Sequence, residues 1–193
     1  MKKTLYLMRH GQTQFNALGK IQGWCDSPLT QEGIKQAQNA RKYFQEKNIS
    51  FDAAYSSTAE RASDTLEIVT NHKMPYTRVK DLREMNFGRF EGESEALNPN
   101  RTLFEEYFVE YGGESRTMVR KRVVPAICEI MARENHDTVF IVSHAGACLQ
   151  FLTSVTEPKD THWPAFSNCG MIHYSYEDGK FAVEEVIAPN KKP

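Results

Sequence analysis

Two arginines and two histidines have the chemistry needed to bind and transfer a phosphoryl group. His10 stands between Arg9 and Gly11, and the other two residues are Arg61 and His144. A guanidinium carries a rigid set of donors that matches the oxygens of a tetrahedral dianion, so both arginines could bind phosphate. A neutral imidazole can accept a phosphoryl group, and a neighbouring cation suppresses its protonation, which suits His10. His144 could donate a hydrogen bond to a phosphate oxygen and balance charge in the transition state.

Glu84 could supply the proton transfers of such a reaction. A carboxyl group beside the phosphate could protonate the departing alkoxide and later deprotonate the attacking water. On sequence alone, Glu84 is also one of many glutamates that are expected at the surface. The two histidines could instead bind a metal, but the residues near them are arginines rather than carboxylates or cysteines at ligand spacing. The local sequence therefore favours a site without a metal.

Arg61 is expected in the first turn of a helix, where the positive end of the helix dipole disfavours a cation. An anion bound between Arg9 and Arg61 would remove this conflict, because helix N-termini bind anions. The alternative is that Arg61 is an ordinary solvated surface residue.

Strand-like and helix-like segments alternate along the chain. Residues 4–8, 51–56 and 138–143 are predicted strands, 77–82 is a predicted edge strand, and 172–176 and 181–187 are predicted to form a closing hairpin. This order predicts an α/β fold, a three-layer α/β/α sandwich with a mainly parallel central sheet. Ligands bind beyond the carboxyl ends of such strands. If the strands at 4–8, 51–56 and 138–143 are neighbours, their ends bring both arginines and both histidines into one pocket.

Helices are predicted between the strands. One opens at residues 28–30 and has Ile34, Ala37, Arg41 and Phe44 on one face, with the charged end of Arg41 extending to solvent. The next is capped by Ser57 or Thr58 and has an apolar stripe of Ala59, Ala62, Leu66 and Val69. Residues 84–101 are predicted to be a loop. Thr102 and Glu105 form a capping-box pattern before a short aromatic helix that ends at residue 111. Ser115 caps a longer helix that Pro125 should kink or divide, and a last helix covers 145–155.

Length and composition set the class of protein. The chain has 193 residues, 40% of them apolar and 25% charged, which predicts one globular domain over residues 1–193. The formal net charge is −1, so no large basic field is available to bind nucleic acid or an anionic membrane. Arg9 and His10 interrupt the first apolar run, and no segment is long enough to span a bilayer. The four cysteines are widely spaced, which predicts separate reduced thiols in a cytoplasmic protein.

Six blocks of this sequence resemble the histidine phosphatase superfamily, also called phosphoglycerate mutase-like. They are Leu7–Thr13 followed by Asn16, Ile21–Thr30 followed by Gly33 and Gln36–Ala37, Ser56–Thr65, Leu82–Glu84 through Phe90–Gly92, Gly112–Ser115, and Val142–Gly146. A single Arg-His-Gly would be weak evidence. Six blocks in the same order over nearly the whole chain make the resemblance specific.

The resemblance implies a role for each matching residue. His10 would be the phosphoryl acceptor, Arg9, Arg61 and His144 would complete the phosphate pocket, and Glu84 would be the proton donor. Asn16, Gln22, Gly23 and the backbone of Ala145 would line the pocket. No metal or organic cofactor would be needed, and the partner would be a small phosphorylated substrate, or inorganic phosphate or sulfate in its place.

Two departures from the family pattern favour a phosphatase over a mutase. Ala145 follows His144 where mutases tend to have glycine and then asparagine, and Gln12-Thr13 replaces the Glu-Ser of the mutase branch. The chain is also short for a mutase, and Phe90 replaces a frequent tryptophan. We therefore expect a metal-independent phosphomonoesterase of the histidine acid phosphatase type. The alternatives are a bisphosphate-primed phosphoglycerate mutase and a non-catalytic phosphate- or protein-binding module.

The substrate should be selected by residues 84–115, which are expected to cover the phosphate pocket. The aromatic and basic side chains available there are Phe87, Arg89, Phe90, Arg101, Phe104 and Tyr107. Sugar phosphates, phosphoglycerates, nucleotides and aryl phosphates all remain open, as does the oligomeric state. Ordinary packing of the short helix is the alternative role for the aromatic residues.

Overall fold

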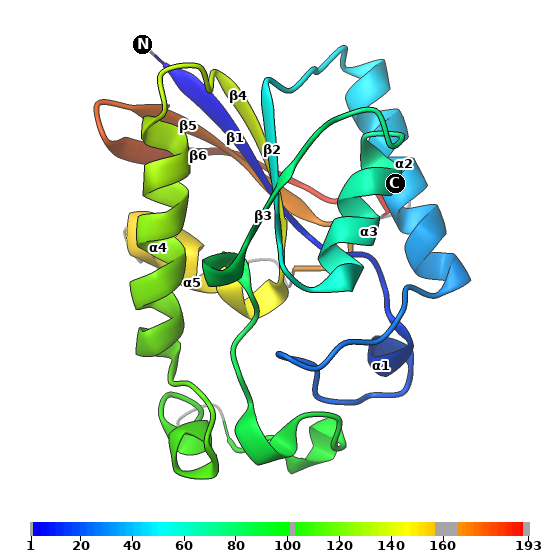
Figure 1. Cartoon of the computed structure of the whole chain (residues 1–193), viewed down its shortest axis with the longest axis vertical. Coiled ribbons are helices and arrows are strands. Elements are labelled where there is room, and N and C mark those ends of the chain that lie inside the picture. The colour runs from blue at the N-terminus through cyan, green and yellow to red at the C-terminus, as the bar shows by residue number, and fades with distance from the viewer. Residues whose placement is uncertain (1, 101–102, 157–165, 191–193) are drawn as a thin grey trace.

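The centre of the protein is a six-stranded sheet (Figure 1). The structure is a computed structural model that describes residues 2–100, 103–156 and 166–190. The strands are β1 (Lys3–Arg9), β2 (Ala53–Ser57), β3 (Thr77–Val79), β4 (Thr138–Ser143), β5 (Met171–Glu177) and β6 (Lys180–Ile187). Their order across the sheet is β3-β2-β4-β1-β5-β6. The strands from β3 to β1 run parallel, and β5 and β6 are antiparallel to their neighbours. The sheet is therefore mainly parallel, as predicted.

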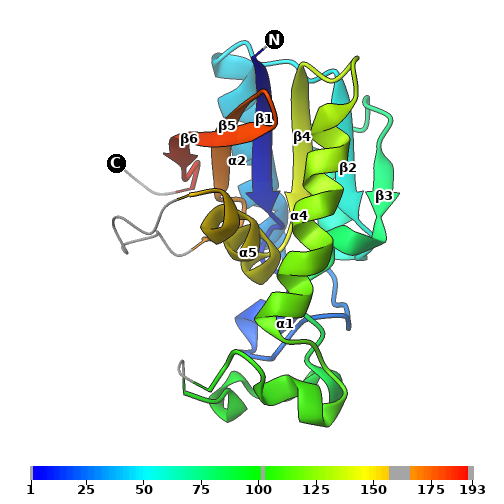
Figure 2. The same ribbon diagram turned by 90° about the vertical axis from the view of Figure 1, so that its left-hand side faces the viewer.

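Helices cover both faces of this sheet. Helices α2 (Gln31–Glu46) and α3 (Glu60–Val69) pack on one face, and α4 (Arg116–Ala132) and α5 (Ala145–Val155) pack on the other. Figure 2 shows α4 and α5 in front of the strands and α2 behind them. The short helix α1 (Gln14–Ala17) follows β1 directly. The predicted three-layer α/β/α sandwich is confirmed.

The sequence of β1 shows why the sheet is covered on both faces. Successive side chains of a strand point to opposite faces. Leu5 and Leu7 belong to the apolar cluster under α4 and α5, whereas Tyr6 and Met8 belong to the cluster under α2 and α3. A strand that must be apolar on both faces appears in the sequence as a continuous apolar run, and this pattern predicts the strand at residues 4–8.

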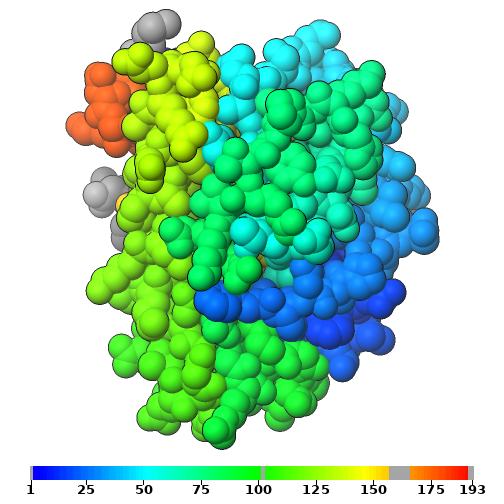
Figure 3. All heavy atoms as spheres, in the orientation of Figure 1, coloured from blue at the N-terminus to red at the C-terminus, as the bar shows by residue number. Residues whose placement is uncertain are grey.

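Residues 80–115 form an extension at the carboxyl ends of the parallel strands. Its described residues, 80–100 and 103–115, contain the short 3-10 helices η1 (Lys80–Leu82), η2 (Gly88–Phe90), η3 (Glu95–Leu97) and η4 (Tyr107–Tyr111). The backbone of Gly19 and Ile21 pairs with residues 92–95 of this segment. In the space-filling view the blue residues that follow β1 lie against the green residues of the extension (Figure 3). The predicted loop at 84–101 is thus largely irregular, but it is fixed to the chain that follows β1.

The predicted aromatic helix and the predicted division of a helix at Pro125 differ from the structure. The aromatic helix expected from residue 102 is only η4, because its rings pack around the buried Phe108 instead of extending a helix, and the capping residue Thr102 lies outside the described residues. Pro125 does not divide α4, which is continuous from Arg116 to Ala132. Pro125 is exposed, so the helix carbonyl that it cannot bond lies on the solvent side.

Helices α2 and α3 also differ in detail from the prediction. Gly33 and Ala40 replace Ile34 and Arg41 on the buried face of α2. The residue before α3 is Ala59, and no side chain from Ser57 or Thr58 caps that helix. The predicted edge strand at 77–82 ends at Val79 and continues as η1. The helix at 145–155 and the closing hairpin are confirmed.

Among the helices of the described ranges, none has the length and apolar character that would be needed to cross a membrane.

Candidate active site

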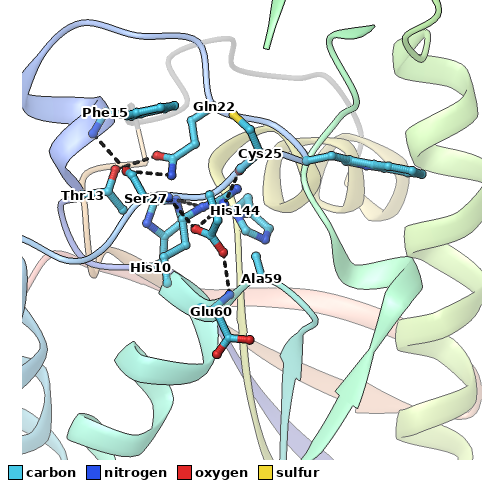
Figure 4. A network of polar contacts seen from close by, with 12 residues as sticks. His10, Thr13, Phe15, Gln22, Cys25, Ser27, Ala59, Glu60 and His144 are labelled. Atoms are coloured by element: carbon cyan, nitrogen blue, oxygen red, sulfur yellow. Dashed lines mark hydrogen bonds and ion pairs between the residues drawn. The ribbon is translucent and has the colours of Figure 1, made fainter. Parts of the chain in front are cut away.

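The carboxyl ends of β1, β2 and β4 bring the two catalytic candidates His10 and His144 together. Strand β4 lies between β1 and β2, and Arg9 of β1 pairs in register with Ser143 of β4. The rings of His10 and His144 follow these two strands, and their centroids are 5.2 Å apart (Figure 4). The predicted convergence of the strand ends is therefore confirmed.

The tautomer of His10 follows from its hydrogen bonds. Its Nδ1 lies 2.7 Å from the carbonyl oxygen of Gly11, and a carbonyl only accepts, so Nδ1 carries the proton. The other nitrogen, Nε2, accepts a hydrogen bond of 3.3 Å from Nε of Arg61. Burial, followed by the charges of Arg61 and Arg9, holds the pKa of His10 well below its ordinary value. His10 is therefore a neutral imidazole whose lone pair is on Nε2.

Arg61 is fully buried behind His10 and is held by protein acceptors. Its Nη2 donates to the carbonyl of Gly23, and its Nη1 donates to the carbonyl of Cys25 and to Oδ1 of Asp26. The surface position considered for Arg61 is thus wrong. Oδ2 of Asp26 accepts the backbone N–H of Glu60, so the protein itself places a negative charge at the start of α3. Asp26 therefore balances the charge of Arg61 and caps the helix that carries it. The anion predicted between Arg9 and Arg61 stays a prediction.

Glu91 fixes the loop that holds Arg61. Its two carboxylate oxygens accept the backbone N–H groups of Gly23, Trp24, Cys25 and Phe87 at 2.7–3.0 Å. Gly23 is buried, and a Cβ at this position would lie 2.1 Å from the carbonyl oxygen of Met85. Only glycine fits there. The loop presents its carbonyls to Arg61 because Glu91 binds its amides.

His144 is oriented by Ser57 at the end of β2. Nε2 of His144 lies 2.7 Å from Oγ of Ser57, and that Oγ also accepts the backbone N–H of Ala59. The hydroxyl hydrogen is then free to bond Nε2, which leaves the histidine proton on Nδ1. This buried Nδ1 has no hydrogen-bond partner among the described residues. Burial, followed by the charges of Arg61 and His10, lowers the pKa of His144 well below its ordinary value.

Arg9 contributes a second buried donor without a partner in the described part of the chain. Its Nη1 donates to the carbonyl of Phe166 at 2.6 Å, whereas its Nε is buried and unpaired. An unpaired buried donor is costly, so each such group implies a missing acceptor. A tetrahedral anion beside His10 could accept from Arg9 and from Nδ1 of His144.

Glu84 lies inside the site, where a proton donor would be needed, and not at the surface, which was the alternative. It is 7% exposed and accepts the backbone N–H groups of Met85, Gly146 and Ala147. The last two amides belong to the first turn of α5, directly after His144. A Cβ at Gly146 would lie 2.5 Å from Oε1 of Glu84, so glycine allows this approach.

A cavity of about 640 Å³ opens over these groups. The predicted site residues on its surface are Arg9, His10, Asn16, Gln22, Glu84 and Ala145. Gly23, Arg61 and His144 are buried behind this surface. Asn168 donates to Oδ1 of Asn16 and to the carbonyl of His10, and Gln22 is fixed between Thr13 and Ser27 (Figure 4).

Of the residues expected to select the substrate, only Phe87 and Phe104 are found on the cavity surface. Phe90 and Tyr107 pack against each other and against Phe108. Arg89 is exposed away from the cavity lining, and Arg101 lies outside the described residues. Other lining residues come from α4, α5 and Phe166, which sequence reasoning missed because no motif marks them.

Sequence reasoning also missed the roles of Ser57, Asp26 and Glu91. Each stands in a block that resembles the family. Ser57 is predicted only as a possible helix cap, and the sequence predicts no role for Asp26 or Glu91. All three act through contacts between residues that are far apart in the chain. In the described part of the chain, no group of three or more histidine, cysteine or acidic residues could hold a metal ion.

Comparison with known proteins places this chain among phosphatases and mutases. The family model of the histidine phosphatase superfamily (branch 1) matches residues 5–188. The adenosylcobalamin/alpha-ribazole phosphatase of Escherichia coli K12 is 29% identical over 174 residues, which cover 82% of each chain. The solved structure of Bacillus stearothermophilus YhfR superposes with a TM-score of 0.82 at 30% identity and covers 94% of this chain and 95% of YhfR.

Similarity to mutases extends over a shorter region. The 2,3-bisphosphoglycerate-dependent phosphoglycerate mutase of Buchnera aphidicola is 42% identical over 95 residues, which are 47% of this chain and 41% of the mutase. This chain thus spans less than half the length of that relative. The shared region supports common phosphoryl chemistry and does not by itself distinguish a phosphatase from a mutase.

Proposed function

This chain belongs to the histidine phosphatase superfamily, branch 1, and on that premise we propose that it hydrolyses small phosphate monoesters through a phosphohistidine on His10. The observation that carries the proposal is the hydrogen bond from Nδ1 of His10 to the carbonyl of Gly11. It leaves the lone pair on Nε2, on a side chain that reaches the cavity and stays neutral because its pKa is lowered. A neutral, oriented imidazole is the form that can attack phosphorus.

In the first step, Nε2 of His10 forms a bond to phosphorus and the ester P–O bond breaks. The departing alkoxide takes a proton from the Glu84 carboxyl group. In the second step, water gives a proton to Glu84 and its oxygen bonds phosphorus. The N–P bond then breaks and returns its electron pair to Nε2. Inorganic phosphate leaves, and both side chains regain their starting protonation states.

The charge on the transferred group is stabilised by donors that the fold already holds in place. The unpaired Nε of Arg9 and Nδ1 of His144 would donate to phosphoryl oxygens. Nε of Arg61, which now donates to Nε2 of His10, would turn its hydrogen to a phosphoryl oxygen once that lone pair is used. These roles need no metal or organic cofactor.

A phosphatase is favoured over a mutase by the residues around this site. Ala145 and Gln12-Thr13 depart from the mutase pattern. A mutase would use the same histidine but would return the phosphoryl group to its product. Adding a bisphosphate primer to 3-phosphoglycerate distinguishes the two, because only a mutase would then form 2-phosphoglycerate.

The test is release of phosphate from p-nitrophenyl phosphate with EDTA present. We expect wild type and the exposed-site control His72→Ala to be active, and His10→Ala to lose at least about a thousandfold in kcat. Acid-labile, base-stable labelling of the wild type after a rapid quench would detect the phosphohistidine directly. Activity that persists in His10→Ala, or that disappears with EDTA, would refute the proposal. Phosphate binding without turnover of any ester would indicate a binding module.

A further inference from the structure

The cavity extends well beyond the groups that would hold the phosphate. Its volume of about 640 Å³ lies in the range that accommodates drug-sized ligands. Five polar or charged side chains line this further part: Lys20, Glu95, Asn98, Arg116 and Gln150. The larger share of its lining is apolar and comes from separate segments: Ile21, Met85, Phe87, Phe104, Val119, Leu149 and Phe166. A serine or glycerol moiety would leave most of these side chains without a partner.

The apolar wall begins close to the reacting phosphorus. Leu149 is one helical turn beyond Ala145 on α5, which places it about 6 Å further along the helix axis. Phe166 is adjacent to the phosphate end, because its carbonyl accepts the hydrogen bond from Arg9. An apolar group on the alcohol of the ester would therefore face this wall.

The wall is already formed and contains aromatic rings. The ring of Phe104 stands edge-on to Phe87 and to the buried Phe108, with centroids 6.4 and 5.2 Å apart. The guanidinium carbon of Arg116 lies 4.7 Å from the centre of the Phe104 ring. These contacts fix the ring in a position where a flat group can pack against it with little loss of entropy.

One polar group on the wall also has a fixed direction. Gln150 is buried at the cavity, and its Oε1 accepts a hydrogen bond of 2.9 Å from Arg120. Its amide NH₂ is therefore the end that remains for a ligand. A fixed donor beside the apolar side chains would orient a ligand against them.

From these observations, and resting on the function proposed above, we propose that the preferred substrates are phosphate monoesters of bulky apolar alcohols that carry a ring. The walls formed by Phe104, Leu149 and Phe166 would bind the ring. Small polar esters such as phosphoserine and glycerol 3-phosphate would be poor substrates, because they leave the wall hydrated.

The test compares 2-phenylethyl phosphate with ethyl phosphate and phosphoserine. All three lose a primary alkoxide, so the comparison reports on binding of the alcohol more than on its acidity as a leaving group. We expect kcat/KM for the phenylethyl ester to exceed the other two by at least about tenfold, since even one methylene in an apolar pocket is worth that much. Equal values, or a preference for phosphoserine, would overturn the inference while leaving the proposed phosphatase intact.

Two variants identify the wall. Phe104→Ala should remove most of the preference for the phenylethyl ester, measured as the ratio of its kcat/KM to that of ethyl phosphate. Leu103→Ala is the matched control, because Leu103 is the neighbouring residue, is 62% exposed and does not line the cavity. A similar loss of preference in both variants would contradict a specific role for the wall. Leu149→Ala provides the same test on α5 if Phe104→Ala does not fold.

Binding of 2-phenylethylphosphonate and ethylphosphonate gives a readout that does not depend on turnover. By titration calorimetry the phenyl compound should bind at least about tenfold more tightly to wild type and show the more negative heat-capacity change of apolar burial. That result without hydrolysis of any ester would support the apolar subsite and refute the phosphatase. Equal affinities would refute the subsite whether or not esters are hydrolysed.

Discussion

Replacing His10 by glutamine should make the stability of the protein less sensitive to acid. His10 and His144 are 4% and 0% exposed, and burial with neighbouring arginines lowers the pKa of each well below its ordinary value. In the folded protein they stay neutral, whereas in the unfolded chain they take up protons near their ordinary pKa. The unfolded state therefore binds more protons as the pH falls, so the stability that these groups contribute above the unfolded pKa is lost on acidification.

The magnitude follows from the unfolded state alone. With an unfolded pKa of about 6.5 and no protonation of the folded form, one histidine lowers the free energy of unfolding by about 1.4 kcal/mol between pH 7.5 and 5.5. His10 and His144 together account for about 2.7 kcal/mol over this interval. His173, whose pKa is also lowered by burial, adds a smaller contribution. His10→Gln should recover about 1.4 kcal/mol of the loss, whatever its effect on stability at neutral pH.

The assay is urea unfolding at several pH values between these limits, in buffer free of phosphate and sulfate. The exposed-site control is His72→Gln, because the side chain of His72 is 66% exposed. Its pH dependence should match that of wild type. If His10→Gln and wild type lose the same free energy over this interval, then His10 is not held neutral in the folded state. That result would also contradict a neutral His10 with its lone pair on Nε2.

Three further substitutions test two contacts that support the site and the proline inside α4. Asp26→Asn should leave Arg61 without its counter-charge. The guanidinium would then be misplaced, and kcat/KM should fall by about 10–100-fold. An unchanged kcat/KM in a folded variant would show that the carbonyls of the loop hold Arg61 in place without Asp26. Glu91→Gln replaces one carboxylate oxygen, so backbone amides on the loop lose a charged acceptor. The free energy of unfolding, measured by urea denaturation, should fall by about 2–4 kcal/mol. Pro125→Ala should raise the free energy of unfolding by about 1–3 kcal/mol by restoring a helix hydrogen bond, and no gain in thermal midpoint would mean that α4 is adapted to the proline.

The sequence by itself identified the central strands and the residues that stand at their carboxyl ends. The continuous apolar runs of β1 and β4 predicted buried strands, because a strand covered on both faces has no polar alternation. The positions of Arg9, His10 and His144 beyond these strands followed from chain direction, since parallel strands end at one edge. The strand pattern and the direction of each strand are properties of short segments. That β1, β2 and β4 are neighbours is a property of the whole fold.

The tertiary structure alone decided how those side chains are held. Asp26 with Arg61, Glu91 with the loop at 23–25, and Ser57 with His144 join residues that are 35, 66–68 and 87 positions apart. The periodicity of a sequence does not predict such pairs. A side-chain hydrogen bond requires that packing place donor and acceptor to within a few tenths of an ångström. The same reason hid the apolar wall. Val119, Leu149 and Phe166 are ordinary apolar residues in the sequence, and they become a binding surface only where α4, α5 and the chain before β5 meet at one cavity.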